Sequence, residues 1–285
     1  MKKQIFILLL VFLLFLVGLG LAAYPMISSY DTQRHQSQVY TQYQELVEKA
    51  DGEELHTARA GAEAYNEVLA SGATTDALEA MNYDSLLNLA GNGIMGYIEV
   101  PAMDVLLPIY HGVSEASLAQ GAGHMPSTSL PIGGKSTHAV ISAHSGMATA
   151  RMFTDLEQLE AGDQFYIHVL DEILAYEVEQ ILVVKPYQTE TLKIDAEQDY
   201  VTLVTCTPYG INSHRLLVRG RRIEQATENN SAAEISPLHT EPKQSTWTVK
   251  YWEGIRDGLF LFLLVIAILT AAMLLTKNWR KRKRP

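Results

Sequence analysis

Two long apolar runs, one near each end of the sequence, constrain the fold more than any other feature. Residues 5–23 and 259–276 consist almost entirely of aliphatic, aromatic and small residues. Each run approaches the roughly 20 residues that a helix needs to span a bilayer. Lys2 and Lys3 precede the first run, and a dense cationic block, residues 277–285, follows the second. Because positive charge marks the cytoplasmic side of membrane helices, we expect both ends of the chain in the cytoplasm and the residues between the runs outside it.

The first run has an alternative interpretation as a cleaved signal peptide. Its apolar part is longer than the roughly 7–15 residues usual in a signal core, and residues 20–24 make a poor cleavage site. We therefore expect a retained anchor, with a signal peptide as the alternative, and both export the residues that follow. A buried core helix is the alternative for the second run, and the cationic block after it disfavours that alternative.

The charge of the segment between the two runs is strongly negative. Eight of the 22 Lys and Arg residues lie in the two tails, which contain no Asp or Glu. The remaining 14 basic residues stand against 32 acidic ones, a formal charge of −18. This balance argues against nucleic acid and against anionic lipid surfaces as partners. It suits a cationic partner, although solubility alone also explains it.

The sequence contains one cysteine, Cys206, so no internal disulfide can form. A single cysteine in an exported protein is a buried thiol, an intermolecular link or a reactive group. No metal site or other cofactor is expected, because the nine histidines include no HExxH pair and one thiol cannot build a thiolate cluster. Residues 91–96 match GxGxxG, but no strand precedes them and a strand follows, so we interpret them as a turn.

The pattern of apolar residues changes from helical to β along the exported segment. Apolar residues recur at helical spacing over residues 29–71, with a break at Asp51-Gly52, and a short helix is expected at residues 150–159. From Gly93 onward, the pattern of apolar and turn-forming residues is that of short strands separated by turns, which favours a barrel or sandwich. The expected strands are 95–100, 105–110, 138–143, 164–170, 174–184, 200–206 and 215–223.

Three residues with complementary chemistry lie at the ends of expected strands. Cys206 ends an apolar strand just before a Thr-Pro-Tyr-Gly turn, where a substrate can reach the thiol. His144 follows another strand, and imidazole can accept and return a proton near neutral pH. Arg215 begins the strand after the turn and offers fixed cationic donors to a developing oxyanion. Each residue alone has an ordinary structural explanation, whereas the set predicts nucleophilic acyl transfer.

Several blocks of sequence support one family. Residues 201–220 begin Val-Thr-Leu-Val-Thr-Cys-Thr-Pro-Tyr-Gly, and Gly-rich or His-containing blocks occur in order at residues 93–101, 121–125, 128–134 and 137–144. Together they closely resemble the sortases, in the pilin-polymerising class C branch, over roughly residues 90–225. The resemblance implies a mainly β, eight-stranded β-barrel, preceded by N-terminal helices and flanked by two transmembrane helices. It also implies a cysteine transpeptidase of the peptidase (hydrolase) class on the outer face of a Gram-positive plasma membrane.

The resemblance assigns roles to individual residues. Cys206 corresponds to the nucleophile, His144 to the acid and base, and Arg215 to the clamp on the oxyanion or substrate. Thr205 and Thr207 flank the nucleophile and are expected to shape the site.

Class C sortases commonly cover the site with a lid carrying Asp-Pro-aromatic. The corresponding region here lacks the proline and the adjacent aromatic residue. Asp76 with Leu78 is the candidate remnant of this lid, and Tyr83 is a candidate substitute for its aromatic residue.

The resemblance also implies substrates and partners. These are pilins or surface proteins with LPxTG-like sorting signals, whose acyl group is passed to the lysine amine of a pilin. The implied organisation has six parts. They are a membrane segment (1–23), a helical region with a possible lid (24–90), the catalytic barrel (91–225), a spacer (226–255), a transmembrane helix (256–276) and a basic cytoplasmic tail (277–285).

Three alternatives remain open on the sequence. A papain-like hydrolase would need a histidine downstream of the cysteine, and His214 is available, although it follows Cys206 too closely for that arrangement. A non-enzymatic exported pilus accessory protein would carry Cys206 as an inert thiol. A housekeeping sortase would use the same chemistry to anchor surface proteins to a cell-wall precursor.

Overall fold

The structure is a computed structural model of the 285-residue chain, and it describes residues 2–147, 150–224 and 255–263. Within the described helices, the side chains of some residues near the N-terminus are also outside the description.

The chain divides into two compact units. One unit comprises Met1–Ala22 together with Gln244–Pro285, and the other comprises Ala23–Lys243. Within the first unit, the rings of Phe15 and Phe262 stack with their centroids 4.4 Å apart. The two apolar runs of the sequence therefore contribute to the same compact unit.

The expected membrane segments are only partly covered by the structure. Among the described residues, no helix is both long enough and apolar enough to cross a bilayer. Residues 264–276 of the second run, the tail at 277–285 and nearly all of the spacer at 226–255 lie outside the described residues. Membrane anchoring by the two runs is therefore not confirmed and stays a prediction.

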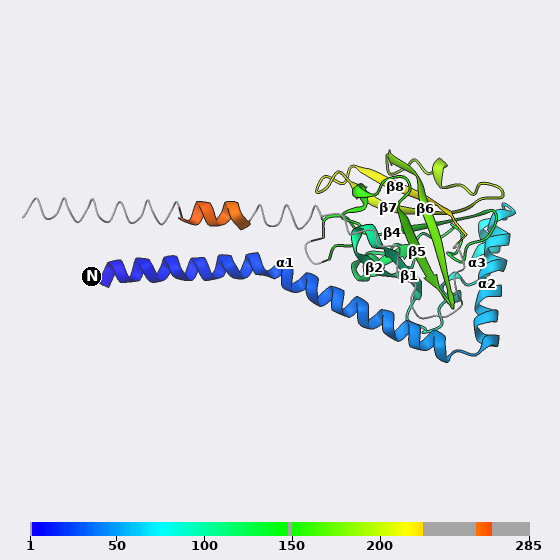
Figure 1. The fold of residues 1–285 in the computed structure, drawn as a ribbon, viewed down its shortest axis with the longest axis horizontal. Helices are drawn as coiled ribbons and strands as arrows, with labels where there is room; N and C mark the ends of the chain where they lie inside the picture. Colours follow the sequence, from blue (N-terminus) through cyan, green and yellow to red (C-terminus); the bar gives the residue numbers. More distant parts are fainter. Residues whose placement is uncertain (1, 148–149, 225–254, 264–285) are drawn as a thin grey trace, which may run out of the picture. The chain divides into compact units, whose positions relative to one another are not determined.

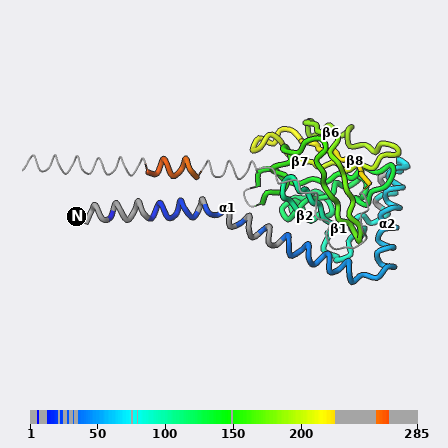
Figure 2. Tube along the Cα trace, viewed as in Figure 1, coloured from blue at the N-terminus to red at the C-terminus, as the bar shows by residue number. Residues whose placement is uncertain are grey.

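Helices precede the barrel, as the sequence predicts. Their bounds are α1 Lys2–Lys49, α2 Gly52–Ala70, α3 Thr75–Glu79 and the 3₁₀ helix η1 Tyr83–Ser85. The expected break between the first two is confirmed at Asp51, whose side chain caps α2 by accepting a hydrogen bond from the Glu54 N–H at 2.7 Å. Figure 2 traces the chain from the later part of α1 through this turn into α2.

Eight strands form a closed barrel in the order β1-β2-β3-β4-β7-β8-β6-β5 (Figure 1). The strands are β1 Ile94–Val100, β2 Val105–His111, β3 Ala122–His124, β4 Thr137–Ser142, β5 Gln164–Val169, β6 Glu172–Val184, β7 Asp199–Thr207 and β8 His214–Arg222. The connections contain the helix α4 Glu115–Gln120 and the 3₁₀ helices η2 Pro101–Met103, η3 Leu156–Gln158 and η4 Glu190–Leu192. The eight-stranded barrel implied by the family resemblance is thus confirmed.

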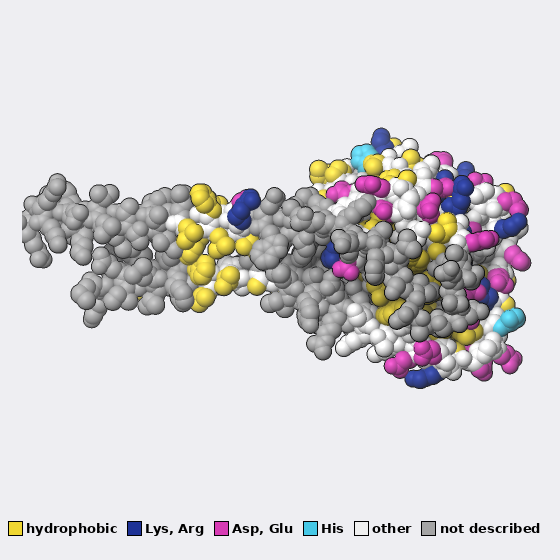
Figure 3. Space-filling model, in the orientation of Figure 1, with side chains coloured by type: hydrophobic (Ala, Val, Ile, Leu, Met, Phe, Trp, Pro, Cys, Tyr) yellow, Lys and Arg dark blue, Asp and Glu magenta, His cyan; other side chains and the backbone are white. Residues whose placement is uncertain are grey.

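Asp and Glu side chains are distributed over the visible face of the barrel unit, interspersed with Lys and Arg (Figure 3).

The prediction of a helix at residues 150–159 is wrong. This segment forms turns followed by the short η3. Met152 adopts a positive φ of 43°, a conformation that cannot continue a right-handed helix. Phe153 and Leu156 are both fully buried, so the segment folds as an apolar plug against the barrel core, and burial overrides the helical spacing.

Both long helices are fixed to the barrel by buried polar contacts. On α1, the Tyr43 hydroxyl donates to the Met95 carbonyl at 3.2 Å and accepts from the Leu170 N–H at 3.0 Å. On α2, the buried Asn66 side chain donates to the Leu130 carbonyl at 3.1 Å and accepts from the Leu130 N–H at 2.7 Å. The Asn66 amide therefore satisfies both main-chain groups of one buried residue in the loop before β4.

The substitution Asn66→Ala tests this attachment. It leaves the buried N–H of Leu130 without a partner, whereas the Leu130 carbonyl still accepts from the Ile132 N–H at 2.8 Å, so we expect a loss of about 1–3 kcal/mol in the free energy of unfolding. Urea unfolding followed by circular dichroism measures the change. Glu67→Ala, an exposed neighbour on the same helix, is the matched control and is expected to change stability by no more than about 0.5 kcal/mol. Equal effects of the two substitutions would contradict the assignment.

Candidate active site

Three adjacent strands bring Cys206, His144 and Arg215 to one edge of the barrel. Strands β4 and β7 are parallel, with Ser142 beside Val204, so His144 and Cys206 each lie two residues beyond that pair. Strands β7 and β8 are antiparallel, and Cys206 is paired directly with Arg215. Neighbouring strands lie about 4.8 Å apart, and paired residues point to the same face of the sheet. Strand pairing therefore places Cys206 directly beside Arg215 on one side and next to the segment that carries His144 on the other.

The three side chains line one cavity of about 330 Å³. Its lining residues are Val113, Leu118, Met125, Ser142, Ala143, His144, Val184, Lys185, Pro186, Gln188, Thr189, Leu192, Val204, Thr205, Cys206, Arg215 and Leu217. Val204 and Leu217 belong to a small apolar cluster distinct from the barrel core, and Leu192 and Met125 pack against that cluster. The cavity thus offers an apolar floor that leads to a half-buried thiol.

His144 is held by contacts to its main chain and to that of its neighbour. The carbonyl oxygen of His144 accepts from the Phe153 N–H at 3.0 Å, so the buried plug at residues 150–159 fixes the turn after β4. The Thr205 hydroxyl donates to the carbonyl of Ala143 at 2.8 Å and ties β7 to the residue before His144. Nε2 of His144 lies 3.8 Å from Oε1 of Glu115, whose side chain is largely exposed.

The Arg215 guanidinium is available to a ligand. Its Nη1 donates to the His214 carbonyl at 3.1 Å and, at 3.4 Å, to the Asn212 carbonyl. Among the described residues, no carboxylate lies within 4.0 Å of it. A guanidinium that contacts only main-chain carbonyls keeps donors for an anion or a carbonyl oxygen in the cavity.

The candidate residues Thr207, Asp76 and Leu78 lie outside the cavity, unlike Thr205, which lines it. Thr207 pairs with His214 at the ends of β7 and β8, and His214 Nδ1 is 2.9 Å from the Ser213 hydroxyl. Asp76 is exposed on α3, whereas Leu78 packs against the barrel core. No lining residue of the cavity in the described part of the chain comes from residues 71–90. The structure therefore brings Thr205 to the three site residues and does not bring the candidate lid residues there.

Tyr83, the first residue of η1, also lies outside the cavity and contacts His124 of β3. Its hydroxyl donates to Nδ1 of His124 at 2.7 Å and accepts from the Gly112 N–H at 3.2 Å. Nε2 of His124 donates to the Ser129 carbonyl at 2.8 Å. Burial lowers the pKa of His124 to about 4, because the charged imidazolium is not solvated there. A neutral histidine and a tyrosine thus join the helical region to the barrel.

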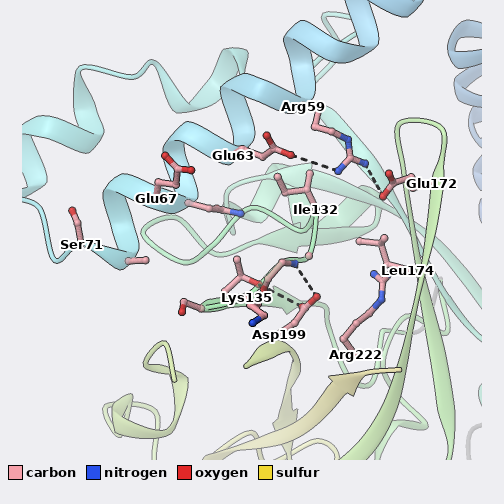
Figure 4. A pocket seen from close by; sticks show the side chains of 16 residues that line it. Arg59, Glu63, Glu67, Ser71, Ile132, Lys135, Glu172, Leu174, Asp199 and Arg222 are labelled. Atoms are coloured by element: carbon pink, nitrogen blue, oxygen red, sulfur yellow. Dashed lines mark hydrogen bonds and ion pairs between the residues drawn. The ribbon is translucent and has the colours of Figure 1, made fainter. Parts of the chain in front are cut away.

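A larger cavity of about 780 Å³ lies between α2 and the end of the barrel opposite Cys206. Two of the contacts drawn in Figure 4 are the ion pair between Arg59 and Glu172 at 2.7 Å and the hydrogen bond that Asp199 accepts from the main-chain N–H of Gly134 at 2.8 Å. Burial raises the pKa of Asp199, although the Tyr176 hydroxyl also donates to it at 3.0 Å. Among the described residues, no cysteine and no histidine lines this cavity, so the smaller one is the candidate active site.

The sequence pattern did not predict one wall of the site. The segment after β6 contributes Lys185, Pro186, Gln188, Thr189 and Leu192 to the cavity. The Lys-Pro pair that ends a long apolar strand was the available signal for a chain reversal at this point. Nothing in the local pattern shows that this reversal folds beside the strands that carry Cys206 and Arg215.

Comparison with known proteins identifies the domain. The family model of the sortase domain matches residues 98–223, which include all three site residues. Sortase C1 from Streptococcus agalactiae is 40% identical, covering 66% of this chain and 99% of that one, with a TM-score of 0.63. The chain belongs to the sortase family.

Two further sortases show the same relationship. A sortase C from Clostridium perfringens, solved with the C-terminal cell wall sorting motif, is 41% identical, covering 66% of this chain and 100% of that one, with a TM-score of 0.59. Sortase A of Bacillus anthracis is 26% identical over 220 residues, or 77% of this chain and 96% of that protein. The solved structures named here are class C sortases, which confirms the resemblance seen in the sequence.

The buried His124 predicts how the stability of this sortase depends on pH. Its pKa falls from 6.5 to about 4 on folding, so the unfolded chain binds the proton first as the pH decreases. Above about pH 6.5, the contribution of His124 to the free energy of unfolding is present in full. As the pH falls toward 4, the free energy of unfolding decreases by up to about 1.4 kcal/mol per pH unit because of His124.

Urea unfolding at several pH values measures this slope. His124→Gln, which cannot titrate, is expected to show a shallower slope than the native chain. His56→Gln, at an exposed position of α2, is the matched control and is expected to keep the native slope. An NMR titration of the His124 ring in the native protein gives an independent answer, and a pKa near 6.5 there would contradict the prediction.

Proposed function

We propose that this sortase is a class C cysteine transpeptidase that cleaves an LPxTG-like sorting signal and joins pilin subunits by isopeptide bonds. The observation that carries the proposal is the placement of Cys206 between His144 and Arg215 at one end of an apolar cavity. Two similar structures support it. One is the Clostridium perfringens sortase C solved with a sorting motif, and the other is a Streptococcus pneumoniae sortase C described in terms of pilin substrate specificity.

In the first half of the reaction, the sulfur of Cys206 attacks the threonine carbonyl carbon of the sorting signal. Negative charge develops on the carbonyl oxygen, and the Arg215 guanidinium can stabilise it with fixed donors. His144 takes the thiol proton of Cys206 and gives it to the departing glycine nitrogen as the peptide bond breaks. The products are a thioester on Cys206 and a free amine on the released fragment.

In the second half, an amine attacks the thioester carbonyl. His144 accepts the proton of the attacking nitrogen, and the sulfur of Cys206 leaves with its electron pair. When the amine is a pilin lysine, the product is an isopeptide bond. Water would give hydrolysis, so the apolar floor formed by Val204 and Leu217 favours transfer by limiting solvent at the thioester.

We further propose that the two apolar runs anchor the enzyme in the plasma membrane with the barrel outside. The support is the length of the runs, the cationic residues at their outer ends and the stacking of Phe15 on Phe262.

Two other functions make different predictions. A housekeeping sortase would form the same thioester but pass the acyl group to a cell-wall precursor amine instead of a pilin lysine. A non-enzymatic pilus accessory protein would form no thioester at all. The position of Cys206 in a cavity beside His144 favours an enzyme over an inert thiol.

Incubation of the protein with a sorting-signal peptide and a pilin tests the proposal. Mass spectrometry is expected to show a thioester on Cys206 and an isopeptide-linked product, and the Cys206→Ala variant is expected to form neither. A thioester without transfer to the pilin would point to the housekeeping function. An unmodified Cys206 in the native protein would refute the enzyme.

The choice of histidine has its own test. His144→Ala is expected to lower the transpeptidation rate by about 10²–10⁴-fold, because it removes the acid and base. His214→Ala is the matched control, since His214 lies outside the cavity, and it is expected to retain most of the activity. The opposite result would favour a papain-like arrangement and refute the role of His144.

Arg215→Lys separates geometry from charge. Lysine keeps the positive charge but loses the planar set of donors, so we expect the acylation rate to fall by about 10²-fold or more. Arg221→Lys, on the same strand but outside the cavity, is the control and is expected to have little effect. A fully active Arg215→Lys variant would show that charge alone suffices.

A further inference from the structure

The charged groups that line the cavity at Cys206 are all basic. They are Lys185 and Arg215, with His144 as a third group that can become cationic. No Asp or Glu in the described part of the chain lines the cavity, although the segment between the two tails carries a formal charge of −18. Glu115 lies 3.8 Å from His144, but its side chain is exposed and does not line the cavity. The charged residues that line the cavity are therefore positive, whereas the net charge of the segment between the tails is negative.

Lys185 is the cation that the proposed reaction does not use. Lys185 is exposed and directly follows β6. Its main-chain N–H donates to the Gln188 side chain at 2.8 Å. Its ammonium group lies 5.9 Å from the centre of the Tyr187 ring. Within the described residues, no carboxylate approaches its Nζ to within 4.0 Å. An ammonium group on the cavity wall is therefore available to an anionic ligand.

Strand register sets the distance between Lys185 and the thiol. Val184 pairs with Arg215, and Arg215 pairs with Cys206. Two strand spacings, about 10 Å, therefore separate Cys206 from Val184, the last residue of β6 and the one before Lys185. A sorting signal that has its threonine carbonyl at Cys206 and runs toward β6 places its preceding residue about 3.4 Å nearer to Lys185 along an extended chain. The side chains of that residue and of Lys185 together can span what remains.

We propose that Lys185 is a specificity-determining residue that favours an acidic side chain at the variable position of the sorting signal. This inference rests on the proposed transpeptidase function and names a substrate class for it. The contact is solvent-exposed, so its effect is expected to be two- to fivefold in rate and to weaken at high salt. A solvated lysine without a role would instead give no dependence on substrate charge.

Three peptides and two variants of the full chain in detergent micelles test the inference. The peptides contain Leu-Pro-Glu-Thr-Gly, Leu-Pro-Gln-Thr-Gly or Leu-Pro-Lys-Thr-Gly, in which Gln is the neutral analogue of Glu. The variants are Lys185→Glu and Lys193→Glu. Lys193 is the matched control because it follows in the same segment, is exposed and also lacks a carboxylate partner among the described residues, but lies outside the cavity. The second-order rate of Cys206 acylation is measured by mass spectrometry.

The native chain is expected to acylate fastest with the Glu peptide and slowest with the Lys peptide. Lys185→Glu is expected to reverse this order, and Lys193→Glu to preserve it. Equal rates for the Glu and Gln peptides in the native chain, or an unchanged order in Lys185→Glu, would overturn the inference while leaving the transpeptidase intact. Acylation by none of the peptides would refute the proposed function itself, and the inference with it.

Discussion

The parallel pairing of β4 with β7 is the interaction on which the rest of the site depends. Parallel strands end at the same edge of a sheet, so this pairing brings residues far apart in the sequence to neighbouring positions at that edge. The antiparallel pairing of β7 with β8 then adds Arg215 on the other side of Cys206. A slip of one residue in either register would turn Cys206 away from one partner, because side chains alternate between the two faces of a strand. Closure of the barrel prevents such slips.

The outer face of these strands combines an apolar floor with basic walls. Val204 and Leu217 exclude water near the thiol, while Arg215 and Lys185 supply positive charge at its margins. Charges act more strongly where water is partly excluded, so a cationic cavity in an acidic domain can orient a peptide before chemistry begins. The same excess of acid elsewhere on the domain would discourage anionic segments from binding outside the cavity.

The sequence was most informative where a local pattern and its chemistry coincide. Cys206 and His144 each follow an apolar run at a turn, and this pattern was sufficient to place both at strand ends. The three-residue strand β3 was missed because Ala122–His124 is too short to show any alternation. The segment around Phe153 was predicted as a helix because its apolar spacing suits one, but its burial as a plug depends on contacts with the whole barrel. Lys185 could not be assigned to the site, because only the closed barrel brings its segment beside Cys206.

The region before the barrel contributes to the site through β3. Tyr83 is hydrogen-bonded to His124, and the next residue, Met125, lines the cavity. Because His124 is buried and neutral, it accepts the tyrosine proton at Nδ1 and donates from Nε2 to Ser129, so its orientation is fixed from both sides. Protonation would remove the acceptor at Nδ1, and the Tyr83 hydroxyl would then have the His124 carbonyl, at 3.3 Å, as its acceptor. The region before the barrel is therefore joined, through a neutral His124, to the segment that supplies Met125 to the cavity wall.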